Sequence, residues 1–291
     1  MIAKEKGLEA FALTEHAPQM PGTCHEFYFQ NLHIVPREMY GVRLFMGVEL
    51  NIMNEKGEVK DSRIVHTIIK SDRRFTYEEA QKVIETGEGD YKEEILELNK
   101  LAQILRKQRL AAGAIDFDRV EVKFEIDETG KPLSVYFKES KEANKLIEEF
   151  MLLANRTVAE KIGKVPKNKK AKVFPYRIHD LPDPDKLENL NWFINRFGYK
   201  IRTSGSKTEI SKSINRLLDD IKNKKEQNLV ETVSLRAMQK ARYSTHNIGH
   251  YGLAFDYYTH FTSPIRRFPD MMVHRLLTRY LGRRTYGTGS E

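Results

Sequence analysis

The sequence predicts an α+β fold in which long helices pack on a twisted, mostly antiparallel sheet, preceded by a small α/β fragment. Two observations support this prediction. Lys92–Leu110 and Lys141–Ile162 are too long to be strands, and the first has apolar residues at helical spacing. Val120–Ile126 and Leu133–Phe137 flank the sequence Glu128-Thr129-Gly130-Lys131, which is typical of an antiparallel hairpin.

The first sixty residues predict a different local organisation. Ile2–Leu8 is expected to be the end of a helix, Ala10–Thr14 a short buried strand, and Val42–Ile52 a second strand after a loop. This order is typical of a piece of an α/β barrel or layered sheet. The composition changes near Val59, where we place a boundary between domains 1–58 and 59–291. The stretch 53–60 is expected to be a hairpin turn.

The elements beyond this boundary follow from local patterns. Arg63–Ile69 alternates as a strand, and Thr76 is placed to cap a helix over Tyr77–Glu85, with Glu79 positioned for a capping box. A basic loop covers 163–170. The remaining predicted elements are one strand and four helices: Phe174–Ile178, Pro184–Phe197, Glu209–Ile221, Gln227–Tyr243 and Met271–Tyr280.

Charge and cysteine content restrict the class of protein. The net charge is +8, and it divides into −2 for residues 1–60 and +10 for residues 61–291, which makes a polyanionic partner plausible for the larger part. Cys24 is the single cysteine, which excludes an intrachain disulfide and a cysteine zinc cluster. We find neither a membrane-length apolar run nor a signal-peptide pattern, and expect a soluble cytoplasmic protein.

The segment Tyr257–Asp270 contains the sequence Ser-Pro-Ile-Arg-Arg. Pro264 fits the first turn of a helix and Ser263 fits its N-cap. This places Arg266 and Arg267 in the first helical turn, where free backbone amides and guanidinium groups together would bind phosphate. Arg267 has an equally weighted alternative, a structural ion pair with Asp270.

This segment closely resembles the arginine-bearing motif of the RNase R / RNase II (RNB-domain) family of 3′-to-5′ exoribonucleases. The resemblance extends over about residues 59–281. The other segments that carry it are Ser71–Glu79, Lys138–Met151, Arg177–Asp180 and Gly249–Leu253. It implies hydrolysis of single-stranded RNA to nucleoside 5′-monophosphates with Mg²⁺.

The resemblance also implies roles for individual residues. Arg266 would be catalytic at the scissile phosphate, and Arg267 would contact RNA. Tyr77 would line the RNA channel, Phe117 would clamp a terminal base by stacking, and Glu148 would orient the terminal nucleotide. Without the resemblance, Tyr77 would be interpreted as a helix-face aromatic, Phe117 as a core residue and Glu148 as a solvated helix residue.

The metal site that the resemblance implies has no match in this sequence. In the family a cluster of aspartates holds the divalent ion, and a two-metal site needs several converging carboxylates. We therefore expect a catalytically incomplete chain, with a non-catalytic single-stranded RNA-binding module as the alternative. His179, His250, His260 and His274 have no helical i, i+3 or i+4 spacing, so we expect structural or RNA-contacting roles for them.

Residues 1–58 resemble a fragment of the PHP family of metal-dependent phosphoesterases. Phe11–Pro18 and Gly47–Ile52 carry this resemblance, which implies that His16 and Glu49 are metal ligands. The segment departs from the family at Glu15, where aspartate is usual, and the family's opening His-x-His ligands are absent. A PHP-type phosphoesterase is thus the third candidate function.

Overall fold

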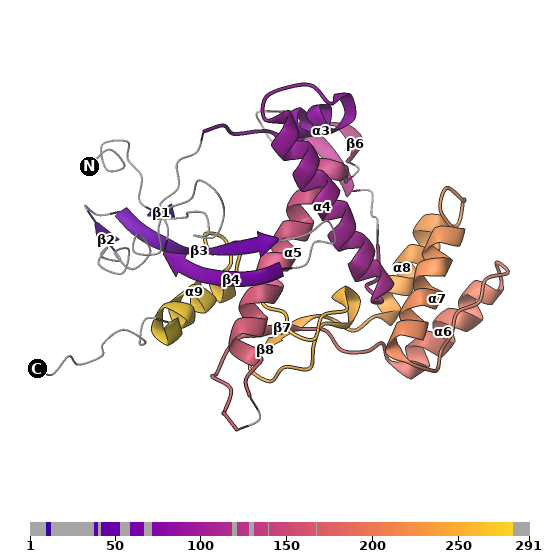
Figure 1. Ribbon diagram of the computed structural model, residues 1–291. Helices are drawn as coiled ribbons and strands as arrows, with labels where there is room; N and C mark the ends of the chain where they lie inside the picture. The colour runs from indigo at the N-terminus through magenta and orange to yellow at the C-terminus, as the bar shows by residue number, and fades with distance from the viewer. Residues whose placement is uncertain are drawn as a thin grey trace, which may run out of the picture.

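The computed structural model describes residues 10–12, 38–39, 42–52, 59–66, 72–117, 121–127, 131–138, 140–166 and 168–281. It is a mixed structure of long helices and small, mostly antiparallel sheets, as predicted (Figure 1). The described strands form three separate sheets, whereas the sequence suggested one. Among the described helices, none combines the length and apolar character needed to cross a membrane.

The N-terminal sheet has four strands. β3 (Val42–Ile52) pairs in parallel with β1 (Ala10–Ala12) and antiparallel with β2 (Glu38–Met39) and β4 (Val59–His66). The predicted second strand is confirmed over its whole length. β3 and β4 flank the expected hairpin turn and pair with each other, although they lie on opposite sides of the predicted domain boundary after residue 58. That boundary stays a prediction. The predicted helix over 2–8 lies outside the described residues.

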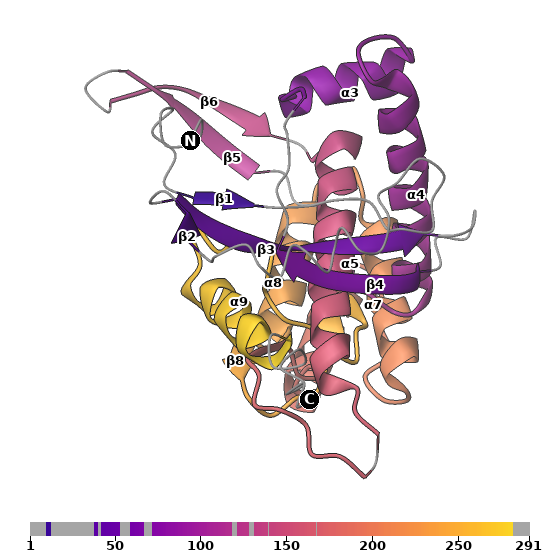
Figure 2. The same ribbon diagram turned by 60° about the vertical axis from the view of Figure 1, so that its left-hand side comes forward.

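Three helices pack against one another: α3 (Tyr77–Thr86), α4 (Lys92–Ala111) and α5 (Glu142–Gly163). The predicted capping box of α3 is present, because the Thr76 hydroxyl accepts from the Glu79 amide at 3.1 Å and the Glu79 carboxylate accepts from the Thr76 amide at 2.7 Å. Both views show α5 as the central helix, with the β3–β4 hairpin crossing it (Figures 1 and 2).

The predicted hairpin is confirmed as β5 (Glu121–Ile126) and β6 (Pro132–Lys138), which pair antiparallel. Its apolar residues share one face, since Phe124 pairs with Val135 and side chains alternate along a strand. Phe124, Ile126, Leu133 and Val135 are each more than half exposed. This hairpin therefore has little core of its own within the described part of the chain.

The described C-terminal part contains two large buried clusters and a small one formed by Leu152, Phe255 and Tyr258. The larger one joins α6 (Pro184–Asn195), α7 (Lys207–Asp220) and α8 (Gln227–Ala237) through side chains such as Leu190 and Ile214. The second lies between α5, β7 (Tyr176–Ile178) and α9 (Phe268–Leu281), with Val158, Phe174 and Leu277 at its centre.

The predicted helix over 227–243 is shorter in the structure. It ends at Ala237, and Arg242–Ser244 form β8, which pairs antiparallel with β7. The local helical pattern is overridden here by a pairing with a strand more than sixty residues earlier. Beyond β8, a short 3₁₀ helix covers Tyr251–Leu253.

Candidate nucleic-acid interface

The arginine motif adopts a turn ahead of α9, so its predicted place in the first helical turn is wrong. α9 begins at Phe268, and the carbonyl of Ser263 accepts from the backbone amides of Arg266 at 3.3 Å and Arg267 at 3.0 Å. Pro269 explains the difference. A helix that began at Pro264 would need an N–H at Pro269 for the carbonyl of Ile265, and proline has none.

A buried aspartate fixes this turn. Asp270 has no exposed surface, and its Oδ2 accepts from the amide of Ser263 and from Nη2 of Arg267, both at 2.8 Å. Of the two interpretations of Arg267, phosphate binding and a structural ion pair with Asp270, the structure contains the ion pair. Arg266 is exposed, and its guanidinium forms no ion pair or hydrogen bond within the described part of the chain. The turn therefore holds one arginine and presents its neighbour to solvent.

The segment before the turn is held from two helices. On α5, buried Asn155 accepts from the amides of Phe261 at 2.8 Å and Thr262 at 3.2 Å, and donates to the Tyr258 hydroxyl at 3.2 Å. On α9, the His274 ring stacks on Phe261 at 4.3 Å between centroids. The position of Arg266 thus depends on residues more than one hundred positions apart in the sequence.

A row of aromatic rings leads away from this segment. His179, His250, Tyr258, His260 and Tyr243 follow one another with ring centroids 5.0 to 5.6 Å apart. His179 Nδ1 accepts from the Gly252 amide at 2.9 Å, so that Nε2 carries the proton and donates to the Gln239 carbonyl at 2.8 Å. Both ring nitrogens of His179 are therefore engaged in the fold.

The histidines in this row are neutral near pH 7. Burial lowers the pKa of His250 to about 3, and the positive charge of Arg177 and the nearby His179 add to the effect. Burial also lowers the pKa of His260 to about 4, together with the charge of Arg267. Tyr243 donates its hydroxyl hydrogen to His260 Nδ1 or accepts from it at 2.7 Å, and the Arg177 guanidinium lies 4.7 Å from the Tyr243 ring centre.

A second polar group surrounds Glu148. Arg109 forms a buried bidentate pair with Glu149, with Nε 3.1 Å from Oε1 and 3.3 Å from Oε2. Arg106 pairs with Asp116 at 2.7 Å. Glu148 itself is exposed, yet the surrounding protein reduces the hydration of its carboxylate and raises its pKa. The charges of Glu149 and Asp116 act in the same direction, and those of Arg109 and Arg106 oppose it.

The predicted site residues lie in separate regions of the structure: Phe117 and Glu148 in one, Tyr77 in another, and Arg266 in the turn before α9. Phe117 is half-buried against the α6–α8 cluster and follows Asp116, so it shares a region with Glu148. Tyr77 is 44 % exposed at the start of α3. In both views α3 and α9 lie on opposite sides of the β3–β4 hairpin (Figures 1 and 2). Tyr77 is therefore not brought together with the Arg266 turn.

His16 lies outside the described residues, and Glu49 is described only through its backbone, as the partner of Arg63 in the β3–β4 ladder. Two positioning residues escaped the sequence analysis, Asn155 and Asp116. The signal for each is tertiary, since Asn155 binds residues beyond position 257 and Asp116 binds Asn215 of α7.

This chain is similar in sequence and in fold to known proteins. A model of the RNB domain matches residues 37–283. Ribonuclease R of Aquifex aeolicus is 36 % identical over 274 residues, covering 88 % of this chain and 37 % of that protein. Ribonuclease R of Thermotoga maritima is 38 % identical over 255 residues, covering 86 % of this chain and 35 % of that protein.

A solved structure extends the likeness to the fold. Mycoplasma genitalium RNase R, determined in complex with ribose-methylated single-stranded RNA, superposes with a TM-score of 0.72 at 26 % identity, over 82 % of this chain and 37 % of that one. This chain spans little more than a third of the length of these relatives.

The RNB match begins at residue 37 and so includes β3 with Glu49, a strand that the sequence analysis assigned to a PHP-like fragment. The comparisons give the PHP resemblance no support. The family match covers the hairpin, the central helices and the arginine turn. This chain belongs to the RNB-domain family, the family of ribonuclease R.

Proposed function

We propose that this chain is the RNA-holding part of a 3′-to-5′ exoribonuclease of the RNase R type, acting on single-stranded RNA and releasing nucleoside 5′-monophosphates with Mg²⁺. The observation that carries the proposal is Arg266, which is exposed and unpaired among the described residues, beside the buried Arg267–Asp270 pair. A guanidinium offers five N–H donors in a planar fork that fits phosphate oxygens, and it would stabilise negative charge that develops during cleavage.

The other predicted contacts support RNA as the partner. Exposed Tyr77 and half-buried Phe117 provide ring faces that can stack on bases of any sequence. Glu148, with its raised pKa, would accept hydrogen bonds from ribose hydroxyls of the terminal nucleotide. The net charge of the larger part of the chain favours binding that weakens with salt.

The described residues do not fit a Mg²⁺ site. They contain no group of three or more histidine, cysteine, aspartate or glutamate side chains placed to share an ion. Three carboxylates beside the proposed contacts in the sequence, Asp116, Glu149 and Asp270, are each paired with an arginine. The ion would therefore need carboxylates from outside the described residues, and we propose that this chain alone does not cleave RNA.

This pairing of carboxylates favours a second candidate, a single-stranded RNA-binding module without catalysis. One experiment separates the two: 5′-labelled single-stranded RNA with the purified chain, Mg²⁺ present or chelated. We expect salt-sensitive binding, weakened about tenfold by Arg266→Ala, with intact RNA. A Mg²⁺-dependent ladder abolished by Arg266→Ala would show a complete enzyme, and an absence of binding at low salt would contradict both candidates.

The PHP-type phosphoesterase has no observation in its favour. Its two proposed ligands are His16, outside the described residues, and Glu49, within the RNB match. Hydrolysis of a small phosphoester that disappears in His16→Ala would be needed to support it.

The cytoplasmic location of the protein stays a prediction.

A further inference from the structure

Arg177 is a half-buried cation to which the proposed function assigns no role. It lies in β7 and pairs with Tyr243 across the β7–β8 ladder, so both side chains stand on the same face of that small sheet. The guanidinium carbon lies 4.7 Å from the centre of the Tyr243 ring. This stacking covers one face of the guanidinium and leaves its N–H groups, which lie in the plane of the group, free to donate.

The Tyr243 ring is held by the segment that carries Arg266. The Tyr243 hydroxyl lies 2.7 Å from Nδ1 of His260, and the two rings meet edge to face. His260 precedes Arg266 in the same segment. This segment is also tied to β7, because the Arg177 amide donates to the Tyr258 carbonyl at 2.9 Å. Arg177 and Arg266 are therefore joined by one connected set of contacts.

Positive charge exceeds negative charge around His260. Burial lowers its pKa first, and the charges of Arg267, Arg177 and Arg266 lower it further, so three guanidinium groups lie near one neutral ring. Asp270 opposes them, and its carboxylate is already paired with Arg267. Within the described residues, neither Arg177 nor Arg266 forms an ion pair or a side-chain hydrogen bond. The two unpaired arginines favour an anionic ligand.

The carboxylate nearest to Arg177 in the sequence, that of Asp180, does not neutralise it. Asp180 is exposed, its Oδ1 accepts from the Leu181 amide at 2.8 Å, and within the described residues it forms no ion pair. A half-buried guanidinium that lacks an acceptor is stabilised when an anion binds to it. A phosphate group suits this position, because two of its oxygens can accept parallel N–H bonds from the guanidinium.

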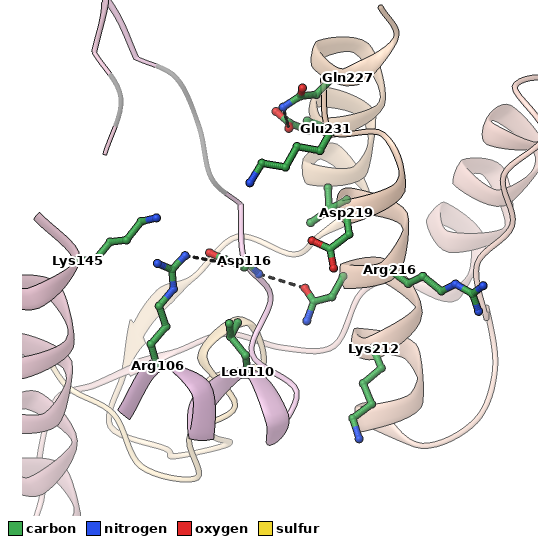
Figure 3. A pocket seen from close by; sticks show the side chains of 12 residues that line it. Arg106, Leu110, Asp116, Lys145, Lys212, Arg216, Asp219, Gln227 and Glu231 are labelled. Carbon is green, nitrogen blue, oxygen red and sulfur yellow. Dashed lines mark hydrogen bonds and ion pairs between the residues drawn. The ribbon is translucent and has the colours of Figure 1, made fainter. Parts of the chain in front are cut away.

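Other arginines differ from Arg177 in this respect. A polar cavity of about 460 Å³ lies beside Asp116, between α4, α5 and the pair α7–α8 (Figure 3). The arginines in its lining have carboxylate partners, since Arg106 pairs with Asp116 at 2.7 Å and Arg216 lies 3.9 Å from Asp220. Compensated charges of this kind do not select an anion, whereas the arginines near His260 do.

We propose that Arg177, held on the Tyr243 ring, binds a second phosphate of single-stranded RNA, next to the phosphate that Arg266 contacts. Tyr243 and His260 are positioning residues in this site. They fix the guanidinium before RNA binds, which reduces the entropy lost on binding. Two fixed phosphate contacts also set the direction in which the strand lies. The inference rests on the proposed function, because it names a further contact to the same RNA.

The salt dependence of RNA affinity counts phosphate contacts. For a single strand, each contact adds about 0.7 to the slope of log affinity against log salt concentration. Affinity of the purified chain for labelled single-stranded RNA is measured by fluorescence anisotropy at several salt concentrations. Arg177→Gln should weaken binding about tenfold at low salt and reduce the slope by about 0.7. The double variant Arg177→Gln, Arg266→Gln should reduce the slope by about 1.4, because two separate phosphate contacts are lost.

Arg196→Gln is the matched control, because the Arg196 guanidinium also lies over an exposed aromatic ring, 4.0 Å from the centre of Trp192 on α6. It should leave affinity and slope unchanged. Tyr243→Phe keeps the ring and removes the hydroxyl that bonds to His260, so it should weaken binding about threefold without changing the slope. Arg177→Lys should also keep the slope and lose part of the affinity, because an ammonium group retains the charge without the planar fork.

An unchanged slope in Arg177→Gln would overturn the inference, as would an equal loss of affinity in Arg196→Gln. The inference would also fail if the double variant had the slope of either single variant, because both arginines would then share one phosphate. Thermal unfolding shows whether each variant is folded. If Arg177→Gln does not fold, unchanged affinity in both Arg177→Lys and Tyr243→Phe would overturn the inference.

Arg266→Gln alone, measured in the same way, separates the two proposals. If it lowers affinity and slope while Arg177→Gln changes neither, the proposed function stands and this inference is removed. If Arg177→Gln lowers the slope while Arg266→Gln does not, the phosphate contact at Arg177 stands and the role of Arg266 that carries the proposed function is contradicted.

Discussion

Asp270 and Arg267 form a 2.8 Å ion pair in which the carboxylate is completely buried. The same oxygen, Oδ2, accepts from the Ser263 amide and closes the turn that carries Arg266. Adjacent arginines in one short motif therefore have different environments. Arg267 belongs to the fold, and Arg266 is available for a ligand.

Removing the charge of Asp270 should destabilise the chain. In Asp270→Asn the Arg267 guanidinium loses its counter-ion in a half-buried position. We expect the free energy of unfolding to fall by about 3 kcal/mol, at the lower end of the range for a broken buried pair because Arg267 is partly exposed. Urea denaturation measures this change, with exposed Asp185→Asn as the control. Equal midpoints for the two variants would contradict the structural role of Asp270.

Asn155 is expected to affect stability and RNA binding together. Asn155→Ala leaves the amides of Phe261 and Thr262 and the Tyr258 hydroxyl without their partner. Unmet hydrogen bonds at buried positions should cost about 3 kcal/mol in total. The loosened segment should also weaken RNA binding through misplacement of Arg266. Denaturation and gel-shift titration of the same variant test both effects. If the variant is destabilised but keeps its full affinity for RNA, Asn155 does not position Arg266 for RNA binding.

The buried histidines should make the chain less stable in acid. The pKa values of His250 and His260 are lowered to about 3 and about 4 from an ordinary value of 6.5. Between these values and 6.5 the unfolded chain binds more protons than the folded chain, so stability falls as pH falls through this window. Unfolding free energy measured between pH 7 and pH 4 should decline less steeply in the double variant His250→Gln, His260→Gln. Parallel curves would show that other groups cause the decline.

Local sequence patterns predicted those elements whose determinants are local. The capping box of α3 needs only Thr76 and Glu79. β3 has an apolar residue at every second position from Val42 to Ile52, the spacing of a strand with one buried face. The start of α9 was mispredicted because Pro264 favours a helix start while Pro269, five residues later, prevents a continuous one. A close inspection of the two prolines could have revealed this.

The candidate site was harder to predict, because its positions depend on tertiary contacts. Arg266 stood out from the sequence alone, but its exposure follows from Asp270 and Asn155, which fix the surrounding turn. The alternatives for Arg267 could be separated only by the observed pair with Asp270. The cavity beside Asp116 combines residues from α4, α5, α7 and α8, and no pattern along the chain announces it.

The central claim is that Arg266 binds RNA, whereas Arg267 stabilises the fold. It is tested most directly by measuring single-stranded RNA affinity and unfolding free energy for Arg266→Gln and Arg267→Gln side by side. We predict that Arg266→Gln loses about tenfold in affinity with unchanged stability, and that Arg267→Gln loses stability by about 3 kcal/mol. Unchanged RNA affinity in Arg266→Gln, with unchanged stability in Arg267→Gln, would contradict the account.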